Sequence, residues 1–127
     1  MRVLLFNNRF HVMICDQDKL QTCRHHAHCN PGDKLSLRGW LGKPYRSHQF
    51  LLAEATCQKV EPVEIDLVGP ALFVRLYNVL LQGCDLYRFA RADGFRDTQD
   101  MTAFFADQYP RMVRRHERFL GECIYWN

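Results

Sequence analysis

The order of apolar and polar residues predicts strands up to about residue 81 and helices in most of the remaining chain. Leu35 and Leu37 alternate with polar residues within residues 34–40, which is the two-residue period of a half-buried strand. Asn30-Pro31-Gly32-Asp33 before it predicts a tight turn, because proline presets one dihedral and glycine tolerates the left-handed region. Further strands are predicted over residues 2–6, 21–24, 50–65 (bent near Pro62), 72–81 after the Gly69-Pro70 turn, and 119–126.

Helical spacing is clearest in residues 97–109, where Asp97 can cap the first turn and Pro110 ends the helix. One side of this helix carries Met101, Phe104, Phe105 and Tyr109. We expect this stripe to pack in the core and not to bind a cofactor. Shorter helices are predicted over residues 12–19 and 84–92. Strands at both ends with helices late in the chain favour an α+β fold of about five to six strands and two or three short helices.

The chain has 127 residues, of which 47% are hydrophobic and 24% charged, a composition typical of globular proteins and unlike disordered ones. This length fits one domain over residues 1–127, and no repeat, low-complexity tract or linker divides it. No apolar stretch approaches the roughly 20 residues of a membrane helix, so no membrane association is expected. The apolar run at residues 3–6 is too short for a secretion signal, which favours the cytoplasm.

Thiol and imidazole groups, which can hold metals or form disulfides, are numerous in this sequence. The six cysteines are widely and irregularly spaced without a Cys-x-x-Cys pair, so we expect reduced, mostly buried side chains. Zinc-type ligand atoms cluster in His25, His26, His28 and Cys29, but no second half of a metal site follows at a suitable spacing. We therefore expect surface histidines, and neither a metal nor another cofactor.

Basic residues are concentrated in one part of the chain, although the net charge is only +3. Between positions 19 and 46, a single acid, Asp33, stands against Lys19, Arg24, Lys34, Arg38, Lys43 and Arg46. Trp40 and Tyr45 lie among these bases, and a basic surface with aromatic side chains suits a polyanion such as RNA. The alternatives are a solvated loop face and, for Trp40, a place in the core instead of a stacking role.

A second basic run precedes the last predicted strand and consists of Arg111, Arg114, Arg115 and Arg118, with His116. Such a run is commonly a solvated connection between two elements. If it lies beside a binding cleft, it extends a track for phosphates and makes binding sensitive to salt. The sequence leaves both alternatives open.

Four segments, in this order, resemble the ASCH family, a group of small PUA-like β-barrel proteins. They are Lys19-Leu20-Gln21-Thr22-Cys23-Arg24, Asn30-Pro31-Gly32-Asp33-Lys34-Leu35, Arg91-Ala92-Asp93-Gly94-Phe95 with the helix and Pro110 after it, and Phe119-Leu120-Gly121-Glu122-Cys123-Ile124-Tyr125-Trp126. Together they span most of the chain. The resemblance implies a PUA-like small β-barrel with a cleft lined by the first segment.

The resemblance also implies functions, because members of the family are thought to bind RNA or act on it. One branch removes the acyl group from N4-acylated cytidine with a lysine, a threonine and a carboxylate, which match Lys19, Thr22 and Asp93 here. This chain departs from the pattern at Leu20, where the family has a threonine, and at Asp93, where that branch has glutamate. The aspartate is one methylene shorter, and a reach error near 1 Å can cost about 100-fold in rate.

The chemistry of the first segment depends on whether the chain bends after Lys19. In a regular strand Thr22 and Arg24 share one face, and Lys19 points to the other. In the catalytic hypothesis Lys19, with a lowered pKa, activates the Thr22 hydroxyl, Asp93 handles the leaving-group proton, and Arg24 contacts a phosphate or base edge. In the structural alternative Lys19 and Arg24 are solvated, Thr22 is an ordinary strand residue and Asp93 caps or turns the chain.

The leading expectation is a module that binds RNA or a nucleotide and recognises single-stranded or modified RNA in a cleft. Its predicted binding residues are Lys19, Thr22, Arg24, Arg38, Trp40, Lys43 and Arg46. The first alternative is an N4-acetylcytidine amidohydrolase that uses Lys19, Thr22 and Asp93. The second is a metal-dependent ribonuclease, for which the sequence does not cluster carboxylates, and partner-protein binding stays open. A monomer or weak dimer is expected.

Overall fold

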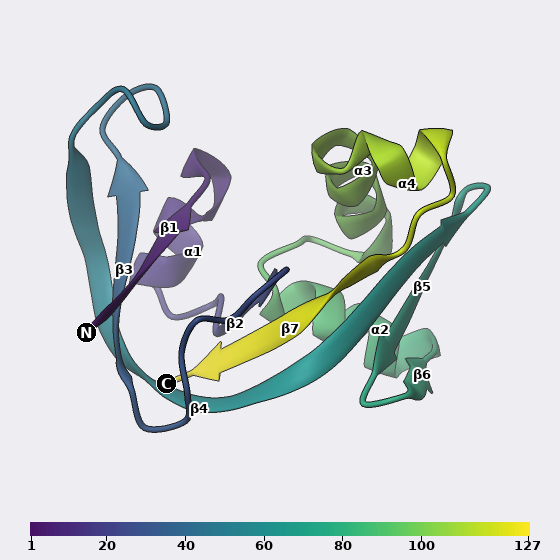
Figure 1. The fold of residues 1–127 in the computed structure, drawn as a ribbon, viewed down its shortest axis with the longest axis horizontal. Coiled ribbons are helices and arrows are strands. Elements are labelled where there is room, and N and C mark those ends of the chain that lie inside the picture. Colours follow the sequence, from purple (N-terminus) through teal and green to yellow (C-terminus); the bar gives the residue numbers. More distant parts are fainter.

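The computed structural model describes residues 1–127 and has an α+β fold with seven strands and four short α-helices (Figure 1). The elements in chain order are β1 (Arg2–Phe6), the 3-10 turn η1 (Asn8–Phe10), α1 (His11–Cys15), β2 (Gln21–Arg24), β3 (Lys34–Trp40), β4 (Gln49–Val68), β5 (Ala71–Leu76), β6 (Val79–Leu81), α2 (Gly83–Ala92), α3 (Thr98–Gln108), α4 (Pro110–Arg114) and β7 (Phe119–Trp126). None of the helices has the length and apolar character needed to cross a membrane.

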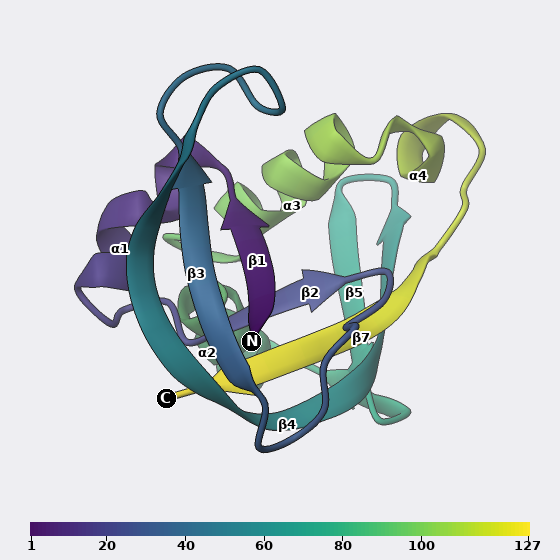
Figure 2. The same cartoon turned by 60° about the vertical axis from the view of Figure 1, so that its left-hand side comes forward.

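The 20-residue strand β4 joins two parts of the sheet. Its first part pairs antiparallel with β3, which in turn pairs parallel with β1. Its second part pairs antiparallel with β5 and β7, which carry β6 and β2 respectively. A register shift between Cys57 and Lys59 falls at the junction, where the extra residue increases the bend of the strand. Figures 1 and 2 show β4 curving from one part of the sheet to the other.

The expectation of a closed barrel of about five to six strands is wrong, because this seven-stranded sheet stays open. β1 pairs only with β3, and β2 pairs only with β7, so no backbone ladder joins β1 to β2. Instead, the Arg24 side chain crosses the gap, and its Nη2 donates a hydrogen bond to the Leu5 carbonyl oxygen at 2.6 Å. Helices also number four, one more than the upper expectation.

The core confirms the predicted role of the helical stripe on α3. Met101 and Phe105 are buried within a cluster of 25 hydrophobic residues, and Phe104 packs against that cluster. Asp97 caps the helix as predicted, since its carboxylate accepts a hydrogen bond from the Asp100 backbone N–H at 2.8 Å. Pro110 ends α3 but also begins α4, because proline at the first position of a helix sacrifices no intrahelical hydrogen bond.

Several element boundaries differ from those the sequence predicts. The strand expected over residues 72–81 is the hairpin β5–β6, and its turn at Tyr77-Asn78 places both residues at positive φ, as a two-residue hairpin turn requires. The helix expected over residues 12–19 ends at Cys15, and Gln17 turns the chain at a φ of 62°. β4 continues through Pro62. The proline interrupts no pairing with β5, because that pairing begins only at Val63.

Candidate functional site

A cavity of about 320 Å³ lies between the N-terminal segment, β2 and α3. Four side chains that the sequence singled out line it: Lys19, Thr22, Arg24 and Asp93. Aromatic rings from separate elements complete the wall, among them Phe10, Phe104 and Tyr109. The cavity thus combines a mostly hydrophobic and aromatic lining with a few converging polar side chains, which is the usual composition of a small-ligand site.

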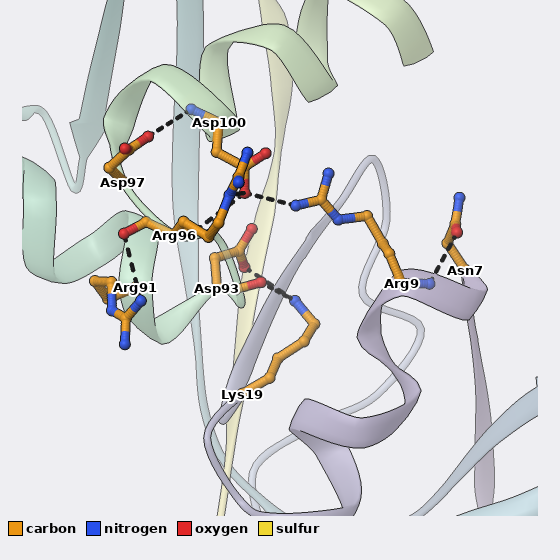
Figure 3. A network of polar contacts seen from close by, with 8 residues as sticks. All are labelled: Asn7, Arg9, Lys19, Arg91, Asp93, Arg96, Asp97 and Asp100. Atoms are coloured by element: carbon orange, nitrogen blue, oxygen red, sulfur yellow. Dashed lines mark hydrogen bonds and ion pairs between the residues drawn. The ribbon is translucent and has the colours of Figure 1, made fainter.

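The chain bends just before β2, and this bend resolves the question of where Lys19 points. The Lys19 backbone N–H donates to the Met13 carbonyl oxygen, and that of Leu20 donates to the Ala92 carbonyl oxygen. β2 begins only at Gln21, so the side-chain alternation of the strand does not fix the direction of Lys19. Its side chain reaches inward to Asp93, as Figure 3 shows, and lines the same cavity as Thr22.

Lys19 and Asp93 form a buried pair at the inner end of the cavity. Lys19 is 1% exposed and Asp93 is 4% exposed. The Lys19 Nζ lies 3.6 Å from Asp93 Oδ1 and donates a hydrogen bond to the Asp93 main-chain oxygen. The ammonium group also lies 4.4 Å from the centroid of the Phe10 ring. The amine is thus held by a carboxylate, a carbonyl and an aromatic face, all without direct access to bulk water.

Burial favours the neutral form of both partners and therefore shifts their pKa values in opposite directions. Desolvation lowers the pKa of Lys19, although the Asp93 charge opposes the change. Desolvation raises the pKa of Asp93 to about 6, although Lys19 and the Gln21 side chain oppose it. Two titratable groups with shifted pKa values that face one cavity are a recognised mark of a functional site.

Two buried polar atoms have no hydrogen-bond partner: Asp93 Oδ1, which belongs to this pair, and Gln21 Nε2. Lys19 Nζ and Asp93 Oδ1 form an ion pair at 3.6 Å, and this distance is too long for a hydrogen bond. Buried polar atoms are nearly always satisfied, so this donor and this acceptor are available to a polar ligand, or to each other after a small side-chain movement, because the Gln21 side chain already acts on Asp93. Sequence reasoning missed Gln21, although its position within the Lys19–Arg24 segment was the available signal.

Arg24 and Thr22 lie side by side at the β1 side of the cavity. The Arg24 Nε donates a long hydrogen bond of 3.4 Å to Thr22 Oγ1, and its guanidinium lies 4.9 Å from the centroid of the Phe6 ring. Desolvation lowers the pKa of Arg24. No hydrogen bond joins Thr22 to Lys19, so the structure brings the residues of the catalytic hypothesis into one cavity without connecting the hydroxyl to the amine.

A second set of polar contacts holds the walls of the cavity together. The Arg9 Nη2 donates to Asp100 Oδ2 at 2.6 Å and so ties η1 to α3, as Figure 3 shows. The Arg9 guanidinium lies over the Phe95 ring at 5.1 Å from its centroid. Asp100 also accepts a hydrogen bond from the Arg96 backbone N–H at 3.0 Å. The N-terminal segment, the turn after α2 and the start of α3 are therefore fixed relative to one another.

The other predicted binding residues divide into two groups. Trp40 lines an adjoining cavity of about 540 Å³ and lies 5.3 Å, centroid to centroid, from Tyr45. Arg38, Lys43 and Arg46 line neither cavity. The Arg38 Nε donates to Ser36 Oγ at 2.8 Å, which directs this side chain along β3.

The histidines of residues 25–28 are exposed, as predicted, while Cys29 is buried. The His25 ring packs against Phe119 at a centroid distance of 4.5 Å. His26 and His28 lie 5.6 Å apart. No group of three or more His, Cys, Asp or Glu side chains is placed to hold a metal ion.

Comparisons with protein-family models, curated proteins and solved structures return no match for this chain.

Proposed function

We propose that this protein binds a nucleotide unit, free or within single-stranded or modified RNA, in the cavity lined by Lys19, Thr22, Arg24 and Asp93. The observation that carries the proposal is the convergence of one carboxylate, Asp93, and two cationic side chains, Lys19 and Arg24, on this cavity of about 320 Å³ with aromatic walls. The resemblance of four ordered segments to the ASCH family supports the same function. We further propose that the open α+β sheet is a variant of the PUA-like barrel of that family.

The chemistry of the cavity suits a nucleotide better than a purely apolar ligand. A carboxylate oxygen accepts hydrogen bonds from the exocyclic amine of a base. Aromatic rings such as Phe10 and Tyr109 offer faces for a base, and the Arg24 guanidinium offers a fork of donors for a phosphate. The volume is at the lower end of the range of about 300–1,000 Å³ common for small-ligand pockets.

Calorimetric titration with cytidine, cytidine 5′-monophosphate and N4-acetylcytidine tests this function. Wild-type protein is expected to bind at least one of them, and Asp93→Asn and Arg24→Gln to weaken binding by about 10-fold or more, because each removes a charge-assisted hydrogen bond. Arg88→Gln is a matched control, since Arg88 lies on α2 outside this cavity. Folded wild-type protein that binds none of a full set of nucleosides and nucleotides would overturn the proposal.

A second candidate function is hydrolysis of an N4-acylated cytidine. The position of Lys19, Thr22 and Asp93 in one cavity favours it, because burial lowers the pKa of Lys19 and so makes its neutral, proton-accepting form easier to reach. In this function the Thr22 oxygen attacks the acyl carbonyl while Lys19 takes the hydroxyl proton. Asp93 passes this proton from Lys19 to the leaving N4 amine, and water then hydrolyses the acyl-threonine ester, which releases acetate and restores the Thr22 hydroxyl.

Incubation with N4-acetylcytidine distinguishes the two candidates. An enzyme releases cytidine and acetate, loses this activity in Thr22→Ala and keeps part of it in Thr22→Ser, which preserves the hydroxyl. A pure binding module binds the compound without releasing acetate, and Thr22→Ala then changes affinity only. Release that survives in Thr22→Ala would show that the threonine is not the nucleophile.

A further inference from the structure

The proposed nucleotide cavity is the middle one of three cavities that share walls. On the β1 side it shares Arg24 and Tyr45 with the cavity of about 540 Å³ that Trp40 lines. On the α3 side it shares Gln108 and Tyr109 with a third cavity of about 290 Å³. This third cavity lies between the end of α3, α4 and the start of β7. The two outer cavities therefore adjoin the central cavity, which holds the Lys19–Asp93 pair, on two sides.

The cavity on the β1 side, here the aromatic cavity, is suited to a base. Its outer wall is formed by Trp40, Pro44 and Tyr45, and its other wall by Asn7 and Asn8. The Trp40 and Tyr45 planes are tilted by 50°, so these two rings do not stack face to face on each other. Tyr45 is 87% exposed, which leaves its ring free to pack on a base. Aromatic side chains of this kind hold bases of single strands with little regard to sequence.

The cavity on the α3 side, here the basic cavity, is suited to a phosphate. Arg111 lines it and makes no ion pair, and the exposed Arg114 and Arg115 follow on the same segment. Arg118 also lines it, but Glu64 holds the guanidinium at 2.5 Å. Glu117 is the one acid in this wall and offsets one arginine, so the excess positive charge comes from Arg114 and Arg115, which are exposed beside the cavity and do not line it.

We propose that these three cavities form one track for a single-stranded oligonucleotide. One nucleotide occupies the central cavity, a neighbouring base stacks in the aromatic cavity, and the backbone on the other side contacts Arg111 in the basic cavity. The inference rests on the proposed function, because it takes the central cavity as a nucleotide site. It adds the class of ligand, which is an internal nucleotide of a strand in preference to a free mononucleotide.

The shared walls are the reason for preferring an internal nucleotide. Arg24 and Tyr45 border the central cavity on one side, and Gln108 and Tyr109 border it on the other. A strand can therefore enter past one pair and leave past the other. The two outer cavities also differ in chemistry, one aromatic and one basic, as stacking and phosphate contacts require.

Binding of cytidine 5′-monophosphate and of a cytidine RNA trinucleotide to the same protein tests the track. We expect wild-type protein to bind the trinucleotide about 10-fold or more tightly than the mononucleotide, because stacking and phosphate contacts are added. Trp40→Ala and Arg111→Gln are each expected to weaken trinucleotide binding by about 5- to 10-fold or more and to leave mononucleotide binding unchanged. Neither residue lines the central cavity, which is why the mononucleotide is the internal reference.

Two controls separate the contacts from general effects. Trp40→Phe keeps an aromatic face and is expected to retain most of the trinucleotide affinity. Arg88→Gln removes the same charge as Arg111→Gln outside all three cavities and is expected to leave both affinities unchanged. Arg111→Gln should also reduce the steepness of the salt dependence by about 0.7 in a double-logarithmic plot, the value for one phosphate contact on a single strand.

The two possible failures are distinguishable. Equal affinity for mononucleotide and trinucleotide, with both variants behaving as wild type, would overturn the track and leave the central nucleotide site standing. Loss of mononucleotide binding in Trp40→Ala or Arg111→Gln would also overturn it, because the three cavities would not act as separate subsites. No binding of either probe to folded wild-type protein would overturn the proposed function itself.

Discussion

Two basic stretches, residues 19–24 and residues 41–48, look alike in sequence and differ completely in the folded protein. In the first, the Lys19 ammonium is 1% exposed and faces the Asp93 carboxylate. In the second, Lys43 and Arg46 are exposed and make no ion pair. The difference teaches that positive charge in a sequence does not by itself indicate a binding surface. What distinguishes the cations of the first stretch, Lys19 and Arg24, is that they line a cavity and are shielded from water, whereas Lys43 and Arg46 are exposed and line none.

The same difference sets the energetic importance of each charge. Removing a buried cation from water is costly, and the cost is offset only while its counter-charge and hydrogen bonds are in place. An exposed cation keeps its hydration and is screened by salt, so it contributes little to folding. Substitutions in the two stretches should therefore give effects of different size.

Lys19→Met is expected to have the largest effect. It leaves the buried Asp93 carboxylate without its cation, and we expect the free energy of unfolding near neutral pH to fall by about 3–5 kcal/mol. Denaturant unfolding followed by circular dichroism measures this loss. Lys43→Met is the matched control and should change stability by less than about 0.5 kcal/mol. The double variant Lys19→Met with Asp93→Leu should recover much of the loss. If Lys19→Met and Lys43→Met lose the same amount of stability, the contrast between the two stretches is wrong.

Asp93→Asn is expected to change how stability depends on pH. A folded-state pKa of about 6, above the ordinary value of 3.8, means that the native protein binds this proton more tightly than the unfolded chain. The stability contributed by Asp93 is therefore fully present below about pH 4 and is lost as the pH rises through about 6. Relative to Asp93→Asn, the wild type should lose about 3 kcal/mol over this range, since one pKa unit equals about 1.4 kcal/mol.

Unfolding curves of both proteins at several pH values between about 3 and 7 test this sign, because this range spans the two pKa values of 3.8 and about 6. Asp16→Asn is a suitable control, since Asp16 is exposed and its carboxylate makes no ion pair and no hydrogen bond. A wild type that becomes more stable than Asp93→Asn as the pH rises would show that the Asp93 carboxylate is stabilised by Lys19 more than it is penalised by burial.

The variants Gly94→Ala and Gly32→Ala compare the buried site with an exposed turn at a similar φ. Gly94 has a φ of 98°, and an added Cβ would lie 2.9 Å from the Phe10 ring and 3.0 Å from the Lys19 side chain. Gly32 has a φ of 94° with no atom within 4 Å of an added Cβ. Gly32→Ala should cost about 1 kcal/mol from the backbone alone, and Gly94→Ala about 1–2 kcal/mol more from crowding. If both variants lower the thermal unfolding midpoint equally, the Phe10 and Lys19 side chains move to make room for the added methyl group.

Local signals in the sequence were sufficient for much of the fold. The turn at residues 30–33 with the strand after it, and the Asp97 cap with the helix after it, follow from short-range chemistry, and the structure confirms them. The closed barrel was wrong because closure depends on long-range pairing, and a side chain from Arg24 takes the place of a β1–β2 ladder. The hairpin turn at Tyr77-Asn78 was missed because it contains no glycine to mark its positive φ.

The candidate site was predictable in part for similar reasons. Spacing and resemblance selected Lys19, Thr22, Arg24 and Asp93, and one cavity contains all four. Gln108 and Tyr109, which border two cavities, lie at the end of a helical stripe that the sequence assigns to the core. A side chain at the edge of a core can line a cavity as well, and periodicity does not separate these two roles.

The double variant Lys43→Gln with Arg46→Gln is expected to have the smallest effect and sharpens the comparison most directly. Both side chains are exposed on the 41–48 loop and line none of the three cavities, so stability should change by less than about 0.5 kcal/mol. Cytidine 5′-monophosphate binding should also stay within about twofold of wild type at physiological salt, because screening weakens exposed charges beyond about 8 Å. Arg24→Gln, measured in the same calorimetric titrations, removes only one charge and should weaken binding more than the double variant. If the double variant instead weakens mononucleotide binding as much as Arg24→Gln does, the exposed loop closes over the central cavity and the two basic stretches act as one site.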